Sequence, residues 1–139
     1  MAMTIHVDVV SAEQEIYSGL AEFVLVPAEM GDLGITPRHT PLLTRMRPGE
    51  IKIRNAEGKE EYIYVSGGIL EIQPRMITIL SDTAARTKDL DEAAVMNAKR
   101  RAESALADQK EGFEFAKATA ELAEAVAQLR AIERIRKMG

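Results

Sequence analysis

The sequence predicts an α+β fold, in which an N-terminal antiparallel β-sandwich is followed by a C-terminal antiparallel helical hairpin. Short apolar segments separated by turn residues recur about every 8–12 positions in the first half, a spacing typical of an antiparallel sandwich or barrel. After Asp82 alanine becomes the commonest residue, and it is the best helix former. We therefore expect a sandwich domain over residues 1–86 and a helix-turn-helix domain over residues 87–139.

The strands are expected from alternation and from turn residues. Ile5, Val7 and Val9 alternate with polar residues, as in a half-buried strand. Ser18-Gly19 is expected to form a turn, and Gly67-Gly68 to form a bulge or a close backbone approach. Further strands are expected over residues 21–27 (covered on both faces), 42–46, 51–53, 62–65, 69–73 and 76–80.

Residues 31–43 are the most unusual stretch of the first half. Two glycines and two prolines fall within eleven residues, a density that excludes a helix and interrupts a strand. Leu33, Ile35, Leu42 and Leu43 are apolar, so we expect a shaped loop with these side chains held down. Two interpretations remain open: a loop packed on its own domain, or a contact loop for another protein.

The second half is expected to form helices over residues 89–108 and 114–137, with residues 108–112 breaking the pattern. Asp89 is expected to cap the first helix, with Glu92 in capping-box spacing. The expected apolar stripe of the first helix is Leu90, Ala94, Ala98, Ala102 and Leu106. That of the second helix is Leu122, Ala125, Val126, Leu129, Ile132 and Ile135.

The facing positions of this hairpin are mostly alanine, which buries little apolar area. The hairpin should therefore be marginal alone and should dock on its own sandwich or on a partner. It is either a switch between two docking sites or a permanently docked completion of the fold.

Composition excludes several classes of function. The net charge is −4 without a basic tract, which disfavours nucleic acid as the main partner, and the absence of cysteine excludes disulfides and thiol chemistry. We expect no signal peptide and no membrane span, so any membrane association should go through a protein partner. His6 and His39 share no metal-ligand spacing, and phosphate-loop and nucleophile-elbow motifs are missing, so we expect neither a metal site nor enzymatic activity of the chain itself.

The second helix has an asymmetric charge distribution. Glu114, Glu121 and Glu124 lie in its first half, and basic residues lie in its last part: Arg130, Arg134, Arg136 and Lys137. This pattern complements the helix dipole, and it also suits a basic tip that docks on an acidic protein surface.

Four segments carry a family resemblance. They are Thr4–Ser11, Gly31–Leu43 with the following Arg47-Pro48-Gly49, Ser66–Glu71, and Leu90–Ala93. In this order they resemble the epsilon subunit of bacterial F-type ATP synthase, from about Met3 to the C-terminus.

The resemblance implies a non-catalytic subunit of the rotating central stalk, on the cytoplasmic face of the bacterial inner membrane. Its partners would be the gamma subunit, the ring of c subunits and the alpha/beta catalytic head. The implied role is to couple proton flow to ATP synthesis and to inhibit ATP hydrolysis through the C-terminal helices. The alternative is a nucleotide-sensing module with little inhibitory role.

The resemblance also implies contact residues. The c-ring contact is expected at Gly31, Asp32, Leu33, Gly34 and His39, and the gamma contact at His39, Pro41, Leu42 and Leu43. The inhibitory contact with the beta subunits is expected at Arg130, Arg134, Arg136 and Lys137.

Several family members bind ATP through an Ile/Leu-Asp-x-x-Arg-Ala motif. Leu90 and Asp91 match it, whereas Ala94 stands in place of the Arg and Val95 in place of the Ala. Arg101, Arg130 and Arg134 are further candidates for holding a nucleotide. Because the planar charged donor of the motif is lost, we expect ATP to bind weakly or not at all, and no cofactor to be needed.

Overall fold

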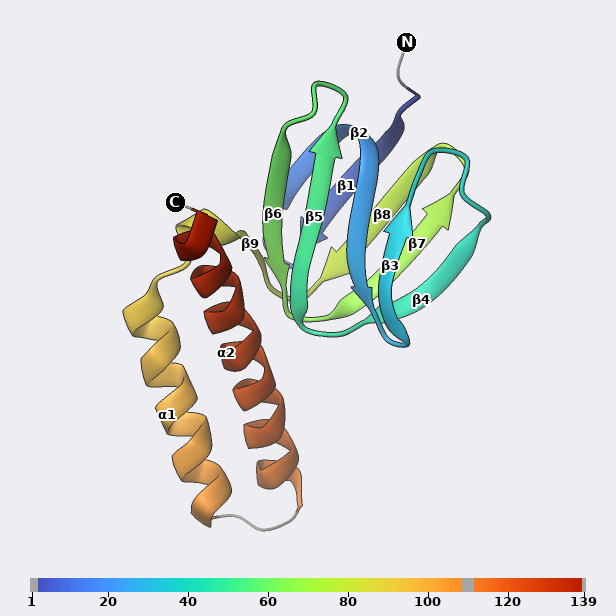
Figure 1. The fold of residues 1–139 in the computed structure, drawn as a ribbon. Helices are drawn as coiled ribbons and strands as arrows, with labels where there is room; N and C mark the ends of the chain where they lie inside the picture. Colours follow the sequence, from blue (N-terminus) through green and yellow to red (C-terminus); the bar gives the residue numbers. More distant parts are fainter. Residues whose placement is uncertain (1–2, 109–111, 139) are drawn as a thin grey trace. The chain divides into compact units, whose positions relative to one another are not determined.

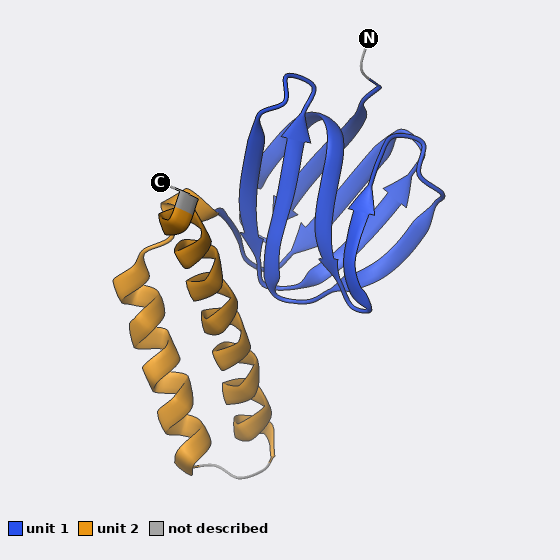
Figure 2. Ribbon diagram, viewed as in Figure 1, with its two compact units in different colours: residues 1–86 blue, residues 87–139 orange. Residues whose placement is uncertain are grey.

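The computed structural model describes residues 3–108 and 112–138, which divide into two compact units, residues 1–86 and 87–139 (Figures 1 and 2). The strands of the first unit are β1 (Ile5–Ser11), β2 (Glu15–Ala28), β3 (Gly31–Ile35), β4 (Leu42–Met46), β5 (Gly49–Asn55), β6 (Glu60–Val65), β7 (Gly68–Gln73), β8 (Met76–Ser81) and β9 (Ala84–Arg86). The second unit contains a short 3-10 helix, η1 (Thr87–Asp89), and the helices α1 (Glu92–Asp108) and α2 (Phe113–Met138). The predicted fold class is confirmed.

The strands follow the order β1-β8-β7-β4-β2-β5-β6-β9, with β3 beside β2 and a further pairing of β1 with β2. Figure 1 shows β2, β3, β5 and β6 in one layer, and β1, β4, β7 and β8 in the other. The long β2 joins the two layers, since residues 15–21 pair with β1 and residues 21–25 pair with β5. Neighbouring strands are antiparallel except β1 and β8, which are parallel.

The core lies between the two layers. Alternate residues point inward, as predicted for β1, in which Ile5, Val7 and Val9 are buried. The other buried members of the core cluster are Ala21, Val24, Val26, Ile35, Met46, Ile51, Ile53, Ile63, Val65, Leu70, Ile72, Ile77 and Ile79. Most of these side chains are β-branched, which suits a pleated surface that is covered on one side.

Two sequence-based expectations about β2 are wrong. Ser18-Gly19 is not a turn: both residues lie inside β2, opposite Asp8 and Val7 of β1. Residues 21–27 are not covered fully on both faces either, because Phe23 and Leu25 are only half-buried. A register shift between Ala21 and Phe23 turns Ala21 and Val24 to the same interior, which simple alternation does not predict.

The predicted loop over residues 31–43 is wrong in its first part. Residues 31–35 form β3, which pairs with β2 from Ala28↔Gly31 to Val24↔Ile35. Glycine suits residue 34 of this strand because the Phe23 ring lies close to it: a Cβ atom there would approach a ring carbon atom to 3.2 Å. Only residues 36–41 connect β3 to β4 without regular structure.

The last strand is anchored within the sandwich unit. The Arg86 guanidinium pairs with Glu61 on β6 and donates a hydrogen bond to the carbonyl oxygen of Ile16 (3.2 Å). It also lies over the Tyr17 ring, 6.0 Å from the ring centroid. These contacts fix the end of β9 to β2 and β6, so the sandwich unit closes on its own residues.

In the second unit, α1 and α2 pack along each other and η1 lies against α2. The predicted cap at Asp89 is wrong: Asp89 ends η1, and Asp91 caps α1 instead. Asp91 Oδ1 accepts hydrogen bonds from the backbone N–H groups of Ala93 (3.0 Å) and Ala94 (3.3 Å). The helix therefore begins later than the capping-box spacing suggests.

The predicted stripe on α1 is also wrong in part. Val95 and Ala102 are the buried residues of α1, whereas Ala94 is exposed. A strict four-residue repeat drifts around a helix with 3.6 residues per turn, so contact with a partner helix follows a repeat of about seven residues instead. Among the described residues of α2 the buried ones are Ala118, Ala125 and Ala131, so the buried positions are alanine as expected, but of the predicted stripe only Ala125 is fully buried. The predicted break over residues 108–112 lies largely outside the described residues.

Candidate interaction surfaces

The tip between β2 and β3 carries most of the predicted c-ring contact. Asp32 is exposed, and its Oδ1 atom accepts a hydrogen bond from Arg47 Nη2 (2.8 Å). Arg47 also donates from Nε to the carbonyl oxygen of Ala28 (2.7 Å), so it fastens the tip to the turn between β4 and β5. Met30, at the turn itself, is 96% exposed. The tip is thus a fixed projection with an acidic and an apolar side chain.

His39 does not share a loop with Asp32. The strand β3 separates them: Gly31 and Asp32 begin it, and His39 follows its other end (Figure 1). The backbone N–H of Arg38 donates to the carbonyl oxygen of Pro74 (3.0 Å), and His39 Nδ1 donates to that of Thr40 (2.7 Å). Arg38 adopts a positive φ of 65° in this connection. The single c-ring loop predicted from sequence is therefore two separate places on the sandwich.

The predicted gamma contact begins in this connection with His39 and Pro41 and continues into β4. Leu42 and Leu43 are both exposed, Leu43 to 68%, so the expectation that these side chains are held down is wrong. Leu43 pairs with Glu71 on β7, and the inward residues of β7 are Leu70 and Ile72, so Leu43 lies on the outer face of the sheet. An exposed leucine there is available for contact with another chain.

The neighbouring strands carry an exposed apolar row that sequence reasoning missed. Ile69 lies opposite Leu80, and Leu80 lies opposite Val10, which places the three side chains in one row across β7, β8 and β1. Ile69 is 47% exposed and Leu80 is 48% exposed. We call Val10, Ile69 and Leu80 the outer patch; Leu43 lies on the same face but outside this row, opposite Glu71. Its signal in the sequence is the apolar pairs Val9-Val10, Ile69-Leu70 and Ile79-Leu80, because two consecutive apolar residues in a strand face opposite sides.

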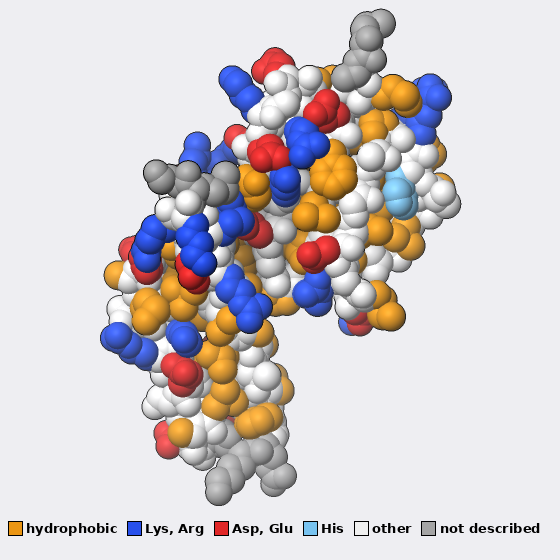
Figure 3. Space-filling model, viewed as in Figure 1, with side chains coloured by type: hydrophobic (Ala, Val, Ile, Leu, Met, Phe, Trp, Pro, Cys, Tyr) orange, Lys and Arg blue, Asp and Glu red, His pale blue; other side chains and the backbone are white. Residues whose placement is uncertain are grey.

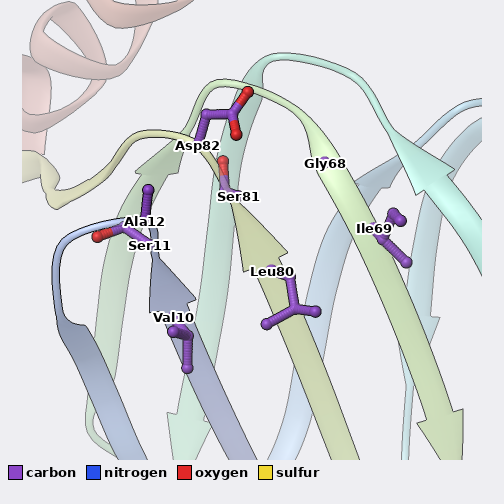
Figure 4. A pocket seen from close by; sticks show the side chains of 8 residues that line it. All are labelled: Val10, Ser11, Ala12, Gly68, Ile69, Leu80, Ser81 and Asp82. Carbon is purple, nitrogen blue, oxygen red and sulfur yellow. The ribbon is translucent and has the colours of Figure 1, made fainter.

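The row in the outer patch opens into a shallow pocket of about 310 Å³. Figure 4 shows Val10, Leu80 and Ile69 on adjacent strands, with the polar residues at the strand ends. The pocket is lined by Val10, Ser11, Ala12, Gly68, Ile69, Leu80, Ser81 and Asp82. The Ser81 side chain makes two hydrogen bonds to the backbone: its Oγ donates to the carbonyl oxygen of Thr83 (2.9 Å) and accepts from the N–H of Ser66 (3.2 Å). These hydrogen bonds hold Ser81 in place, and the lining of the pocket is mainly apolar.

A polar cluster lies on the same outer face, on β1 and β2. Ser18 Oγ donates to Asp8 Oδ1 (2.7 Å), and His6 Nε2 lies 2.8 Å from the same oxygen. The Ser18 hydrogen bond, and to a smaller extent His6, hold the pKa of Asp8 below its usual value against the opposing effect of burial. Ser18 Oγ also lies 3.2 Å from His6 Nε2, but the same ring nitrogen faces Asp8. A relay of nucleophile, base and orienting acid uses both ring nitrogens of the histidine, so this cluster is not one.

The basic end of α2 is partly engaged within the helical unit. The Arg136 guanidinium pairs with Glu92 at the start of α1, and Lys137 Nζ pairs with Glu133 Oε1 (3.2 Å). Arg130 is exposed and Arg134 is half-buried. Figure 3 shows Lys and Arg side chains gathered where α1 begins and α2 ends.

The candidate ATP-binding residues do not all lie at one end of the hairpin: Asp91 and Arg134 are each within two residues of the Glu92–Arg136 pair, whereas Arg101 and Arg130 lie farther along the helices. Asp91 already accepts two backbone hydrogen bonds as the cap of α1. Arg101 follows it by ten positions, which is about 15 Å along a helix. Leu90 is half-buried, Ala94 is exposed, and Arg130 and Arg134 lie on α2. Weak or absent ATP binding stays a prediction.

Two general findings limit the chemistry of the described residues. Within them, no group of His, Asp and Glu residues has the arrangement needed to hold a metal ion. In the same part of the chain, neither helix is long and apolar enough to cross a membrane.

Comparison with known families gives two matches that together cover most of the chain. Residues 4–87 match the model of the ATP synthase delta/epsilon chain beta-sandwich domain, and residues 88–133 match that of the long alpha-helix domain. The chain is 59% identical over 137 residues to the ATP synthase epsilon chain of Nitrosococcus oceani, covering 99% of this chain and 98% of that one. It is 58% identical over 134 residues to that of Alkalilimnicola ehrlichii, covering 96% of each.

Solved structures share the fold at low identity. A chain of the Euglena gracilis mitochondrial ATP synthase, in a structure of OSCP, F1 and c-ring, has a TM-score of 0.81 at 14% identity, covering 93% of this chain and 81% of that one. A chain of the Tetrahymena thermophila mitochondrial ATP synthase central stalk and c-ring has a TM-score of 0.60 at 15% identity, covering 94% and 97%. These two likenesses concern the fold alone.

Proposed function

This chain belongs to the ATP synthase epsilon-chain family, and from that premise we propose that it couples proton flow to ATP synthesis in the central stalk and restrains ATP hydrolysis. It contributes no catalytic residue; the catalytic sites and the proton-carrying groups belong to other subunits. It acts at the cytoplasmic face of the bacterial inner membrane and reaches the membrane only through its partners.

The observation that carries the proposal is the outer patch. Exposed apolar side chains arranged side by side on a sheet are typical of a protein interface, and the pocket beside Leu80 suits one apolar anchor from a partner. We assign this face, together with His39, Pro41, Leu42 and Leu43, to the gamma subunit. The sandwich would thereby rotate with the stalk.

We assign the tip between β2 and β3 to the c-ring. Met30, Gly31 and Asp32 project there, with Leu33 and Gly34 following in β3. Arg47 holds Asp32 in place, so the tip presents a defined surface. A firm contact at this tip would transmit torque from the ring without a flexible loop.

Restraint of hydrolysis would come from the helical unit. This unit is compact by itself, and its interface is rich in alanine, so its conformation is open to change. Arg130, Arg134, Arg136 and Lys137 form a basic end that complements an acidic segment of the catalytic head. The hairpin would block rotation by extending toward that head.

The test separates the two units. A chain of residues 1–86 keeps every strand and the Arg86 anchor, so it should join the stalk and support ATP synthesis. The complex that contains it should hydrolyse ATP severalfold faster than the complex with the full chain. Synthesis in membrane vesicles and hydrolysis in detergent are measured for both.

Three outcomes are informative. Faster hydrolysis with intact synthesis supports both roles. Equal hydrolysis rates would leave a coupling subunit without an inhibitory role, and loss of synthesis despite normal assembly would show that the helices take part in coupling. Far-UV circular dichroism of the isolated 1–86 chain controls for folding.

A further inference from the structure

An ion pair joins the two helices where α1 begins and α2 ends. Glu92 is the first residue of α1 and Arg136 lies in the last turn of α2, and the Arg136 guanidinium donates to the Glu92 carboxylate. We propose that this pair is a latch: it favours the closed hairpin and keeps Arg136 from an acidic partner surface. The second half of this statement rests on the proposed function.

The weakness of the remaining interface makes such a latch effective. The buried residues of the described parts of α1 and α2 are Val95, Ala102, Ala118, Ala125 and Ala131. Four of these five are alanine, whose burial contributes far less than that of leucine. In the closed form the two helices pack together, and in the open form they are separated. If the two forms have similar free energies, an interaction that changes the open-to-closed ratio twofold changes their populations measurably.

The position of the pair adds to its effect. An acid at a helix N-terminus and a base at a helix C-terminus are each favoured by their own helix dipole. The antiparallel hairpin brings these two helix ends together. Closing it therefore joins Glu92 and Arg136, each of which is already stabilised by the dipole of its own helix. The Glu92 and Arg136 side chains are 45% and 63% exposed, so salt should weaken the pair.

Arg136 differs in this respect from its neighbour Lys137. Lys137 pairs with Glu133 in the same helix, so that pair moves with α2 and does not oppose opening. The Glu92–Arg136 pair spans the two helices and must break when they separate. One guanidinium then has two mutually exclusive acidic partners, Glu92 in the closed form and the partner surface in the open form.

A double-mutant cycle on the full chain tests the latch alone. The chain has no cysteine, so spin labels can be placed on the exposed positions Asn97 of α1 and Ala123 of α2. The cycle compares the labelled parent with Glu92→Gln, Arg136→Gln and the double variant. Distance distributions from electron–electron double resonance give the ratio of open to closed hairpin.

Each single substitution should raise the open-to-closed ratio about two- to threefold, as expected for an exposed pair. The two effects should not multiply in the double variant, because either change already removes the pair. The interaction of each residue with its own helix dipole contributes equally to the single and double variants, so the cycle removes it. Glu133→Gln is the matched control, since it removes a pair within one helix and should leave the ratio unchanged. Independent, multiplicative effects of Glu92→Gln and Arg136→Gln would overturn the latch.

Hydrolysis by the assembled complex tests the competition. Glu92→Gln frees Arg136 and should lower the hydrolysis rate, whereas Arg136→Gln removes the partner contact and should raise it. If the cycle shows coupling but neither variant changes hydrolysis, the competition is overturned and the latch stands, while the restraint function is decided separately by the chain of residues 1–86. If the cycle shows no coupling, the latch fails whatever the hydrolysis rates are.

Discussion

Gly68 lies directly against the backbone of Leu80: a Cβ atom on Gly68 would stand 2.0 Å from the Leu80 carbonyl oxygen. Gly68 also has a φ of +121°, which side chains rarely adopt. This close approach at the start of β7 sets Ile69 opposite Leu80 and so builds the outer patch. Gly68→Ala should therefore lower the free energy of unfolding by about 3 kcal/mol or more, measured by urea denaturation.

Gly58→Ala is the control for this prediction. Gly58 has a φ of +83°, but a Cβ atom there would meet nothing within 4 Å. Its substitution should cost only the backbone strain, about 1 kcal/mol. If the two variants lose the same stability, contact with Leu80 is not what requires glycine at residue 68.

The close approach at Gly67-Gly68 was predictable because adjacent glycines inside a strand pattern typically mark a bulge or a place where two backbones meet closely. Alternation likewise predicted the inward residues of β1, since that signal depends only on neighbours in sequence. The register shift at Ala21 and Phe23 was not predictable, because it arises from pairing with β5, which is distant in sequence. The row of Val10, Leu80 and Ile69 depends on the same kind of long-range pairing. The sequence can therefore indicate that each residue faces outward, but not that the three lie side by side.

The cap of α1 gives a second prediction. Asp91→Ala removes the acceptor for the Ala93 and Ala94 N–H groups and should destabilise the hairpin by about 1 kcal/mol. Hydrogen exchange of these two amides should accelerate about fivefold for a loss of that size. Asp89→Ala is the matched control, because Asp89 lies in η1. Equal acceleration in both variants would contradict the assignment of the cap to Asp91.

The polar cluster on β1 and β2 predicts a defined pH dependence. Because Ser18 and His6 lower the pKa of Asp8 in the folded chain, the ionised carboxylate stabilises the fold above the unfolded-state pKa. This contribution is lost as the pH falls through the lowered folded-state pKa. The stability difference between the parent and Asp8→Asn should thus shrink as the pH falls below about 5, which is about one unit above the ordinary carboxyl pKa.

Urea denaturation across this pH range measures the difference, and Ser18→Ala provides the check. The Ser18 hydroxyl is the largest cause of the lowered pKa, so its removal should reduce the pH-dependent part. A difference between parent and Asp8→Asn that persists unchanged at the lowest pH would show that the carboxylate charge is not involved.

The last prediction concerns the outer patch as the docking face for the stalk. Leu80 is already 48% exposed, so Leu80→Asp should leave the urea midpoint of the free chain nearly unchanged. In the complex the aspartate would be buried beside Val10 and Ile69 without a partner, which is costly. We expect association with the gamma subunit to weaken about 100-fold, which corresponds to about 2.7 kcal/mol. Titration of the purified gamma subunit with the full chain measures this loss.

Leu20→Asp is the matched control, because Leu20 is also an exposed leucine on the sandwich. It lies opposite His6, outside the row of Val10, Leu80 and Ile69. Its substitution introduces the same charge and should change the affinity for gamma by less than about threefold, the effect of a peripheral contact. If Leu80→Asp binds as tightly as the parent chain, the outer patch is not the docking face. If both variants bind weakly, the contact extends over a wider area of the outer face than the patch, because an interface that buries only this apolar row tolerates a charge outside it.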